Sequence, residues 1–232
     1  MKKVLLYSGG MDSWLIDKLY KPDIKLFVDI GTPSAKAERK KLPKDVIVVD
    51  FQNLAQFERK EDFILPLRNL YLIALATNYG DEICLGANAT DATLDKTTEF
   101  AEKLSDLLTY MYGEQKWTHE RHIKVNVDYR NFTKAQLLDA YLEQGGSVTE
   151  AYFKTFSCFT PDEDGTECHN CRACFLKFMA FVDNGFWLPN EIASTYLPYM
   201  KRVVNNPHSF SDRLYRKEDY LKVIEHYENN FR

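Results

Sequence analysis

The stretch that decides the fold is "LLYSGGMDSWL", Leu5 to Leu15, near the start of the 232-residue chain. An apolar run ends in Ser8-Gly9-Gly10, and a helix candidate, Asp12 to Tyr20, follows. In an open α/β fold, such a strand–turn–helix corner lies at the carboxyl edge of a parallel sheet, where ligands bind. Glycines let backbone N–H groups approach an anion closely, and the N-terminus of the helix adds a favourable dipole. The stretch therefore predicts a phosphate-binding corner.

Two common phosphate motifs are missing from the chain. No glycine is followed by lysine, which excludes a Walker A loop, and no G-x-G opens a dinucleotide fingerprint. What remains is S-G-G-x-D-S, in which Ser8 and Ser13 add hydroxyl donors to the backbone N–H groups. Asp12 is acidic where phosphates are expected, so we interpret it as a residue that orients the loop or helps to hold Mg²⁺.

The first two-thirds of the chain alternates short apolar runs with amphipathic ones. The strand candidates, rich in Val, Ile, Leu and Phe, are Lys3–Tyr7, Lys25–Ile30, Asp45–Phe51, Glu82–Ala87 and Ile123–Val127. The helix candidates are Asp12–Tyr20, Ser34–Lys41, Leu65–Tyr79, Thr97–Tyr112 and Thr133–Gln144, the last with Thr133 as N-cap and Gly145-Gly146 at its end. This alternation predicts an α/β fold with a doubly wound, mainly parallel sheet.

After Gly146 the pattern changes. A loop-rich stretch, 157–166, leads into a cysteine cluster, and helix candidates follow at 175–182, 190–200 and 217–229. We therefore expect an α/β domain with the phosphate-binding corner over residues 1–146. Residues 147–232 are expected to form a second region, with the cysteine cluster and C-terminal helices packed on that domain.

Composition narrows the class of partner. The chain is 45% hydrophobic with a formal net charge of −4, so it has no global field that favours a nucleic-acid backbone. A small-molecule substrate is the better expectation, and nucleic acid is disfavoured. Because the first apolar run is too short for a secretory signal and no segment is long enough to span a membrane, we expect a soluble, cytoplasmic protein without a membrane partner.

Four of the five cysteines form a compact cluster. Cys158, Cys168, Cys171 and Cys174 spell C-x9-C-x2-C-x2-C, a spacing that can wrap four thiolates around Zn²⁺. An iron–sulfur cluster, disulfides and simple packing are the alternatives, although the ferredoxin continuation C-x3-C-P is missing. His169 lies between the ligands and is a possible substitute for one of them. The fifth, Cys84, lies in an apolar run and is interpreted as a buried small side chain.

The S-G-G-x-D-S string resembles the pyrophosphate loop of the N-type ATP pyrophosphatases. Together with the cysteine spacing, the chain resembles one branch of them, the 7-cyano-7-deazaguanine synthase family, over roughly residues 3 to 185. Further stretches match in the same order: "LPLRNLYLIALATNYGDEICLGAN", "FTKAQLL" and "FSCF". The resemblance implies an adenine nucleotide alpha-hydrolase-like fold, structural Zn²⁺, and Mg²⁺ with ATP as co-substrate. It implies nucleotide or substrate contacts at Tyr7, Ser8, Gly9, Gly10, Met11, Asp12, Ser13, Asp29, Arg68, Gly86, Asn88, Asp91 and Lys134, with catalytic roles for Asp12, Ser13 and Lys134.

The family's reaction, as the resemblance implies, converts 7-carboxy-7-deazaguanine and ammonia into 7-cyano-7-deazaguanine through an adenylated carboxylate and an amide. This chain departs from the family pattern at Leu94–Thr98, at Lys177, where an arginine is usual, and at Asp29-Ile30-Gly31-Thr32. The alternatives are a variant that stops at the amide or uses another acceptor, a tRNA-thiolating enzyme, and a zinc-stabilised binding module without catalysis. A homodimer is a further possibility.

Overall fold

The protein is built around a parallel β-sheet. The computed structural model describes residues 1–61, 64–91, 93–206 and 215–230. Within these ranges the sheet has five strands, all parallel: β1 (Lys3–Leu6), β2 (Ile24–Asp29), β3 (Val46–Asp50), β4 (Glu82–Cys84) and β5 (Lys124–Asn126). Their order is β3-β2-β1-β4-β5, so the expected α/β fold with a parallel sheet is confirmed.

The strand order reverses beside β1. The chain runs outward from β1 through β2 to β3, then returns to the other side of β1 for β4 and β5. Leu5 pairs with Lys25 of β2 and with Cys84 of β4, and Val4 and Leu5 are fully buried because helices cover both faces of this central strand. The point between β1 and β4 is the topological switch point of the sheet, where open α/β folds bind ligands.

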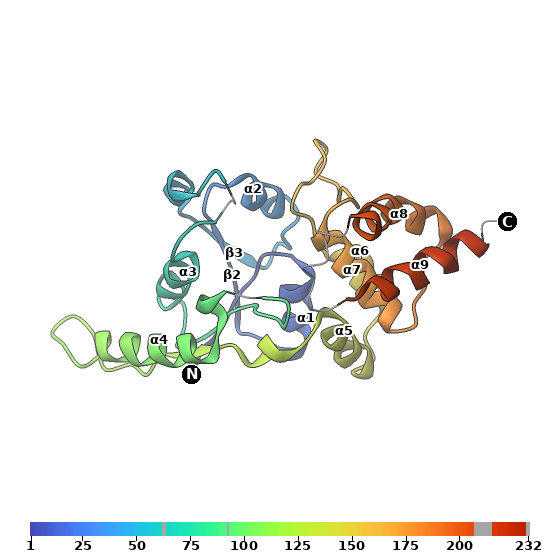
Figure 1. Ribbon diagram of the computed structural model, residues 1–232. Helices are drawn as coiled ribbons and strands as arrows, with labels where there is room; N and C mark the ends of the chain where they lie inside the picture. The colour runs from blue at the N-terminus through green and yellow to red at the C-terminus, as the bar shows by residue number, and fades with distance from the viewer. Residues whose placement is uncertain (62–63, 92, 207–214, 231–232) are drawn as a thin grey trace.

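Helices flank both faces of the sheet. The expected helices appear as α1 (Met11–Tyr20), α2 (Pro33–Arg39), α3 (Arg68–Ala76), α4 (Thr98–Met111) and α5 (Lys134–Glu143). Helices α1 and α3 lie on opposite sides of the strands, and α5 packs against α1 (Figure 1). Thr133 caps α5 as expected: its side chain accepts from the Gln136 N–H, and the Gln136 side chain accepts from the Thr133 N–H. Short 3₁₀ segments occur at Gln52–Phe57, Leu94–Lys96 and Asp128–Asn131.

The C-terminal part is helical and has a core of its own. Its helices are α6 (Val148–Lys154), α7 (Arg172–Asp183), α8 (Asn190–Asn205) and α9 (Lys217–Asn230), of which α6 was not expected from the sequence. Buried aromatic side chains from α7, α8 and α9 form a second hydrophobic cluster, while Phe181 of α7 reaches the core under the sheet. Figure 1 shows α8 and α9 at the opposite end of the molecule from α3. Helix α7 therefore belongs to both cores.

Among the described helices, none has both the length and the apolar character that crossing a membrane would require.

Candidate functional site

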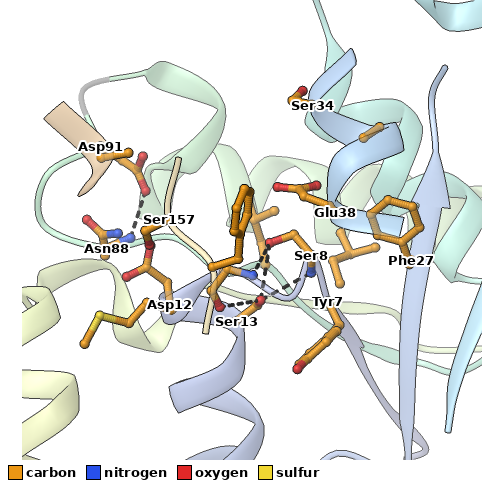
Figure 2. A pocket seen from close by; sticks show the side chains of 18 of the residues that line it. Tyr7, Ser8, Asp12, Ser13, Phe27, Ser34, Glu38, Asn88, Asp91 and Ser157 are labelled. Atoms are coloured by element: carbon orange, nitrogen blue, oxygen red, sulfur yellow. Dashed lines mark hydrogen bonds between the residues drawn. The ribbon is translucent and has the colours of Figure 1, made fainter. Parts of the chain in front are cut away.

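The loop after β1 is shaped by its own serines. Gly9 has a φ of +76°, a backbone conformation that favours glycine, and Gly10 is the N-cap of α1. The Gly10 N–H donates to Ser8 Oγ (3.2 Å), while Ser13 Oγ donates to the Gly10 carbonyl (3.0 Å). The Ser8 N–H donates to Ser13 Oγ (3.2 Å), so the two hydroxyls brace the turn from either side. Figure 2 shows both serines on the floor of a cavity.

An ion pair crosses the first turn of α1. Lys134 opens α5, is only 9% exposed, and its Nζ contacts Asp12 Oδ2. The other carboxylate oxygen, Asp12 Oδ1, is buried and has no hydrogen-bond partner among the described residues. An unsatisfied buried oxygen is costly, so it fits a site that completes its contacts with a bound cation or ligand. A cation and a carboxylate with a free oxygen thus sit beside the phosphate loop.

The end of β4 supplies the neighbouring wall. The Asn88 N–H donates to Asp91 Oδ2 (2.9 Å), and Lys96 Nζ donates to Asp91 Oδ1 (2.7 Å). Gly86 faces α1, where an added Cβ would come within 3.9 Å of Ser13. Because β4 is next to β1 in the sheet, these groups lie at the switch point with the loop.

One cavity of about 430 Å³ joins these elements. The residues inferred from the resemblance that line it are Tyr7, Ser8, Gly10, Met11, Asp12, Ser13, Arg68, Gly86, Asn88, Asp91 and Lys134. Segments far apart in the sequence therefore converge on a single space, as expected for parallel strands whose carboxyl ends share one edge.

Two residues inferred from the resemblance are placed differently. Gly9 is not among the lining residues, and its carbonyl accepts from the Phe156 N–H (3.2 Å). The Asp29 carboxylate is 1% exposed and does not line the cavity; it accepts from the Gly31 N–H (2.9 Å) and from Arg39 (2.7 Å). Asp29 thus holds the turn after β2.

The cavity also contains polar residues that the sequence reasoning missed: Thr32, Ser34, Glu38, Lys96, Ser157 and Arg172. Lys96 falls in the stretch that departs from the family pattern, and its pairing with Asp91 explains why a cation is tolerated there. The sequence contained one weak indication that Glu38 lines the site. It lies four residues after Ser34 in α2, so the two polar side chains lie on the same face of that helix. Burial raises the pKa of Glu38 to about 7, against a smaller opposing effect of Arg68.

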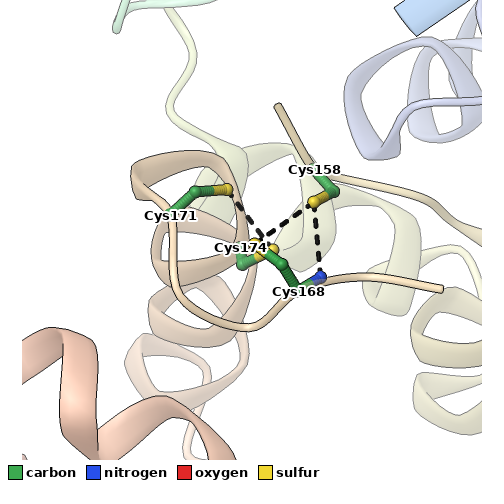
Figure 3. A group of neighbouring side chains, drawn as sticks. All are labelled: Cys158, Cys168, Cys171 and Cys174. Carbon is green, nitrogen blue, oxygen red and sulfur yellow. Dashed lines mark hydrogen bonds between the residues drawn. The ribbon is translucent and has the colours of Figure 1, made fainter. Parts of the chain in front are cut away.

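The four clustered cysteines come together as a candidate metal centre. All are free thiols, and their sulfur atoms lie within 4.8 Å of one another. Cys158 and Cys168 are 3.4 Å apart, and Cys171 and Cys174 are 3.5 Å apart (Figure 3). A tetrahedral zinc with Zn–S bonds of about 2.3 Å has S–S edges of about 3.8 Å, so the donor set and spacing fit Zn²⁺. Cys84 is fully buried in β4, as expected.

His169 does not join this cluster. Its Nδ1 lies 2.9 Å from Thr195 Oγ1, and its ring packs on Tyr196 with centroids 4.5 Å apart. Among the described residues, the group that could hold a metal consists of the four cysteines, and the His169 ring contacts α8 instead.

Lys177 is buried in a network behind the cysteines. Its side chain is 2% exposed, and its Nζ donates to the Thr155 carbonyl (2.8 Å) and to both oxygens of Glu167 (3.1 and 3.2 Å). Glu167 also accepts from the Ser157 N–H. Lys177 does not line the cavity, so this departure from the family pattern concerns the support of the wall.

The segment from Thr155 to Phe159 links the two motifs. Phe156 forms a parallel bridge with Gly10, while Ser157, Cys158 and Phe159 line the cavity. The cysteine-bearing loops therefore form one wall of the space above the phosphate loop.

Comparison with known proteins indicates one family. The family described as "Queuosine biosynthesis protein QueC" matches residues 18–185. A "7-cyano-7-deazaguanine synthase" of Citrifermentans bemidjiense is 29% identical over 131 residues, which cover 52% of this chain and 54% of that protein. One of Stutzerimonas stutzeri is 26% identical over 137 residues, 55% of this chain and 57% of that protein. "7-cyano-7-deazaguanine synthase 1" of Colwellia psychrerythraea is 24% identical over 219 residues, 79% of this chain and 94% of that protein.

The alignments with the first two relatives thus span about half of each relative's length. No solved structure matches the chain significantly. The family match covers more than half of the chain and includes the four clustered cysteines. The chain therefore belongs to the QueC family of queuosine biosynthesis proteins.

Proposed function

We propose that this protein is an ATP-dependent carbon–nitrogen ligase that converts 7-carboxy-7-deazaguanine and ammonia into 7-cyano-7-deazaguanine. The observation that carries the proposal is the convergence of the S-G-G-x-D-S loop, Lys134 and Lys96 on one cavity with a cysteine-anchored wall. Family membership and the names of the relatives support the same substrate class.

The loop is built to receive a triphosphate. The N-terminus of α1 offers a positive dipole, and the Lys134 ammonium lies beside it. In this proposal the β- and γ-phosphates bind here, and Lys134 passes from Asp12 to the phosphates. That exchange places positive charge where the leaving pyrophosphate becomes negative. Asp12, whose Oδ1 has no partner among the described residues, would hold Mg²⁺, and that ion would supply further charge neutralisation.

The proposed reaction uses the same phosphate loop for two successive ATP molecules. A substrate carboxylate oxygen attacks the α-phosphorus and pyrophosphate leaves; ammonia then displaces AMP and loses a proton, which gives the amide. The amide oxygen then attacks the α-phosphorus of a second ATP and releases a second pyrophosphate, and the nitrile forms as AMP leaves with that oxygen and the nitrogen gives up its two protons. The protein's own share is to position the two reactants and stabilise the leaving groups.

The metal centre has a structural role in this scheme. Four thiolates complete a tetrahedral shell and leave no position for substrate, which is typical of structural zinc. Zinc would therefore hold the wall that Ser157 and Phe159 present to the cavity.

Thiolation of tRNA is less well supported. That chemistry would need a reactive cysteine near the ATP site outside the metal cluster, and Cys84 is the only cysteine left. Cys84 is fully buried in the sheet, and burial strongly raises its pKa, so it lacks both access and thiolate character.

The test is incubation of the purified, zinc-loaded protein with ATP, Mg²⁺, ammonium and 7-carboxy-7-deazaguanine. We expect pyrophosphate release and, by mass spectrometry, first the amide and then the nitrile. Ser13→Ala should abolish both while zinc content stays unchanged, and Lys36→Ala, on an exposed position of α2, serves as the control. Accumulation of the amide alone would limit the activity to its first half. No turnover of this acceptor, with sulfur transfer to tRNA instead, would refute the proposal.

A further inference from the structure

The cavity has two chemically different ends. Figure 2 shows Asp12, Asn88 and Asp91 on one side of the phosphate loop, and Phe27, Ser34 and Glu38 on the other. The first end also holds the cations of Lys96 and Lys134. The second end lies over β2 and is lined by apolar side chains: Leu26, Phe27, Val28, Ile30 and Ala35.

Glu38 brings a carboxylate into this apolar end. Helix α2 is fixed at its start by Thr32, whose side chain accepts from the Ala35 N–H (3.3 Å), and the face that carries Ala35 and Glu38 turns toward β2. The Glu38 side chain is half-buried and lines the cavity. It makes no hydrogen bond or ion pair with the described residues, and the charge of Arg68 is the opposing influence on it. A carboxyl group in an apolar wall without a hydrogen-bond partner carries a free-energy cost that a ligand donor can offset.

The backbone beside Arg68 is also unusual. Leu67, which precedes α3, has a φ of +58°, a conformation that a leucine rarely adopts, and Arg68 follows it into the cavity wall. Backbone strain of this kind concentrates at ligand-binding positions. Arg68 and Glu38 line the same cavity from two different helices, and the charge of Arg68 acts on the Glu38 carboxyl.

We propose that the Glu38 carboxyl accepts a hydrogen bond from the 6-amino group of the adenine of ATP and so makes the site selective for that base. This inference rests on the proposed use of ATP. If the phosphates lie on the Ser8–Ser13 loop, the base can reach the apolar end over β2, where its flat faces contact aliphatic and aromatic side chains. The 6-amino group is the only N–H donor on the adenine ring of a nucleotide, and a carboxyl oxygen is an acceptor.

The opposite end suits the acceptor better. A carboxylate substrate needs positive charge near the α-phosphate, and Lys96 lines that end of the cavity together with Asn88. A guanine nucleotide carries a carbonyl oxygen in place of the 6-amino group, so it lacks the donor that Glu38 would accept from at this position.

The experiment is a binding cycle that removes one partner at a time. Calorimetry measures the affinity of the zinc-loaded protein for Mg-ATP and for Mg-purine riboside triphosphate, which carries hydrogen in place of the 6-amino group. For the unsubstituted protein we expect ATP to bind about ten- to a hundredfold more tightly, as for a hydrogen bond to a charged group. Glu38→Ala should bring that ratio close to one. Glu38→Gln should keep most of it, because its side-chain carbonyl still accepts, and Lys36→Ala should keep all of it.

The outcomes separate the two proposals. If the unsubstituted protein binds no ATP, the proposed function fails. If it binds ATP and purine riboside triphosphate equally, only the assignment of Glu38 fails, and this result needs no variant that might misfold. Retention of the full ratio in Glu38→Ala would also overturn the assignment, as would a Glu38→Ala defect confined to binding of the 7-deazaguanine substrate.

Discussion

The two motifs of this protein lie against each other but are held in place by different forces. The phosphate loop follows a strand whose last three residues are buried, and a helix packed in the main core begins directly after the loop, so burial and backbone hydrogen bonds position it. The wall from Thr155 to Cys171 has almost no regular structure. Four thiols and one buried ion pair hold it instead.

This difference indicates which region of the site should fold without a metal and which should not. The corner that would grip the phosphates should exist without metal or ligand, because the sheet forms it. The wall should be ordered only while the four thiols bind their metal and the Lys177–Glu167 ion pair is intact. Removing either interaction should therefore disorder the wall and leave the corner folded, and the following predictions test that separation.

Loss of the metal should have the largest effect. Apparent free energies of structural zinc binding are about 10–16 kcal/mol, so Cys171→Ser should cost several kcal/mol of stability and most of the bound zinc. Hydrogen exchange should show loss of protection at 155–171, with protection of β1 retained. Cys84→Ala is the matched control, because it removes a thiol outside the cluster. One equivalent of zinc and native protection in Cys171→Ser would contradict the assignment.

Breaking the buried ion pair between Lys177 and Glu167 should have the second-largest effect. Lys177→Met leaves Glu167 without its charged partner, and such a change costs about 3–5 kcal/mol because an uncompensated buried charge remains. Urea unfolding measures the loss. The double variant with Glu167→Gln should recover part of it, whereas Lys154→Met, on an exposed position of α6, should have little effect. Equal stability of Lys177→Met and Lys154→Met would show that the pair does not support the wall.

Lys134→Ala should affect the corner without affecting the wall. Removing a charge that stabilises a leaving group costs about 2.7–4 kcal/mol of activation free energy, which corresponds to a hundred- to thousandfold lower kcat for pyrophosphate release. Zinc content should be unchanged, and Lys134→Arg should restore part of the rate because it keeps the positive charge. A loss of zinc or of wall protection in Lys134→Ala would show that the two regions are not separable.

Sequence reasoning was strongest where a pattern is local. The apolar runs predicted all five strands, and the Thr133 cap and Gly145 predicted the ends of α5. Helix α6 was missed because it is short and its buried contact is the single Ala151. The spacing of the four cysteines was also enough to predict that they lie together, because the ligands of a metal ion often lie close together on a short loop.

The parts that were missed depend on three-dimensional context. Lys177 sits three residues after a cysteine, yet only the structure shows that it faces Glu167 rather than the cavity. Glu38 and Lys96 line the site from segments that carry no motif, because sheet order rather than sequence order decides which side chains meet above β1. Asp29 is the opposite case. The resemblance named it as a site residue, but its carboxylate accepts from the Gly31 N–H in the turn after β2 and does not line the cavity.

The smallest expected effect concerns the carboxyl in the apolar end of the cavity. Burial raises the pKa of Glu38 from 4.5 to about 7, so the folded protein holds this proton more tightly than the unfolded chain does. Its stabilising contribution is therefore complete below about pH 4.5 and is lost as the pH rises through about 7. A neutral side chain avoids that loss. Without nucleotide, Glu38→Gln should match the unsubstituted protein near pH 5 and be more stable by about 1–2 kcal/mol at pH 8, a value reduced for partial exposure.

Urea unfolding at both pH values measures the difference, and Glu61→Gln, at an exposed position, serves as the control. Parallel pH dependence of Glu38→Gln and the unsubstituted protein would mean that the carboxyl is hydrated in solution. The apolar end of the cavity would then carry no free-energy cost for a ligand to offset. If the curves do diverge, the apolar end over β2 holds one carboxyl whose burial a ligand donor can compensate, whereas the wall holds four thiols that need a metal.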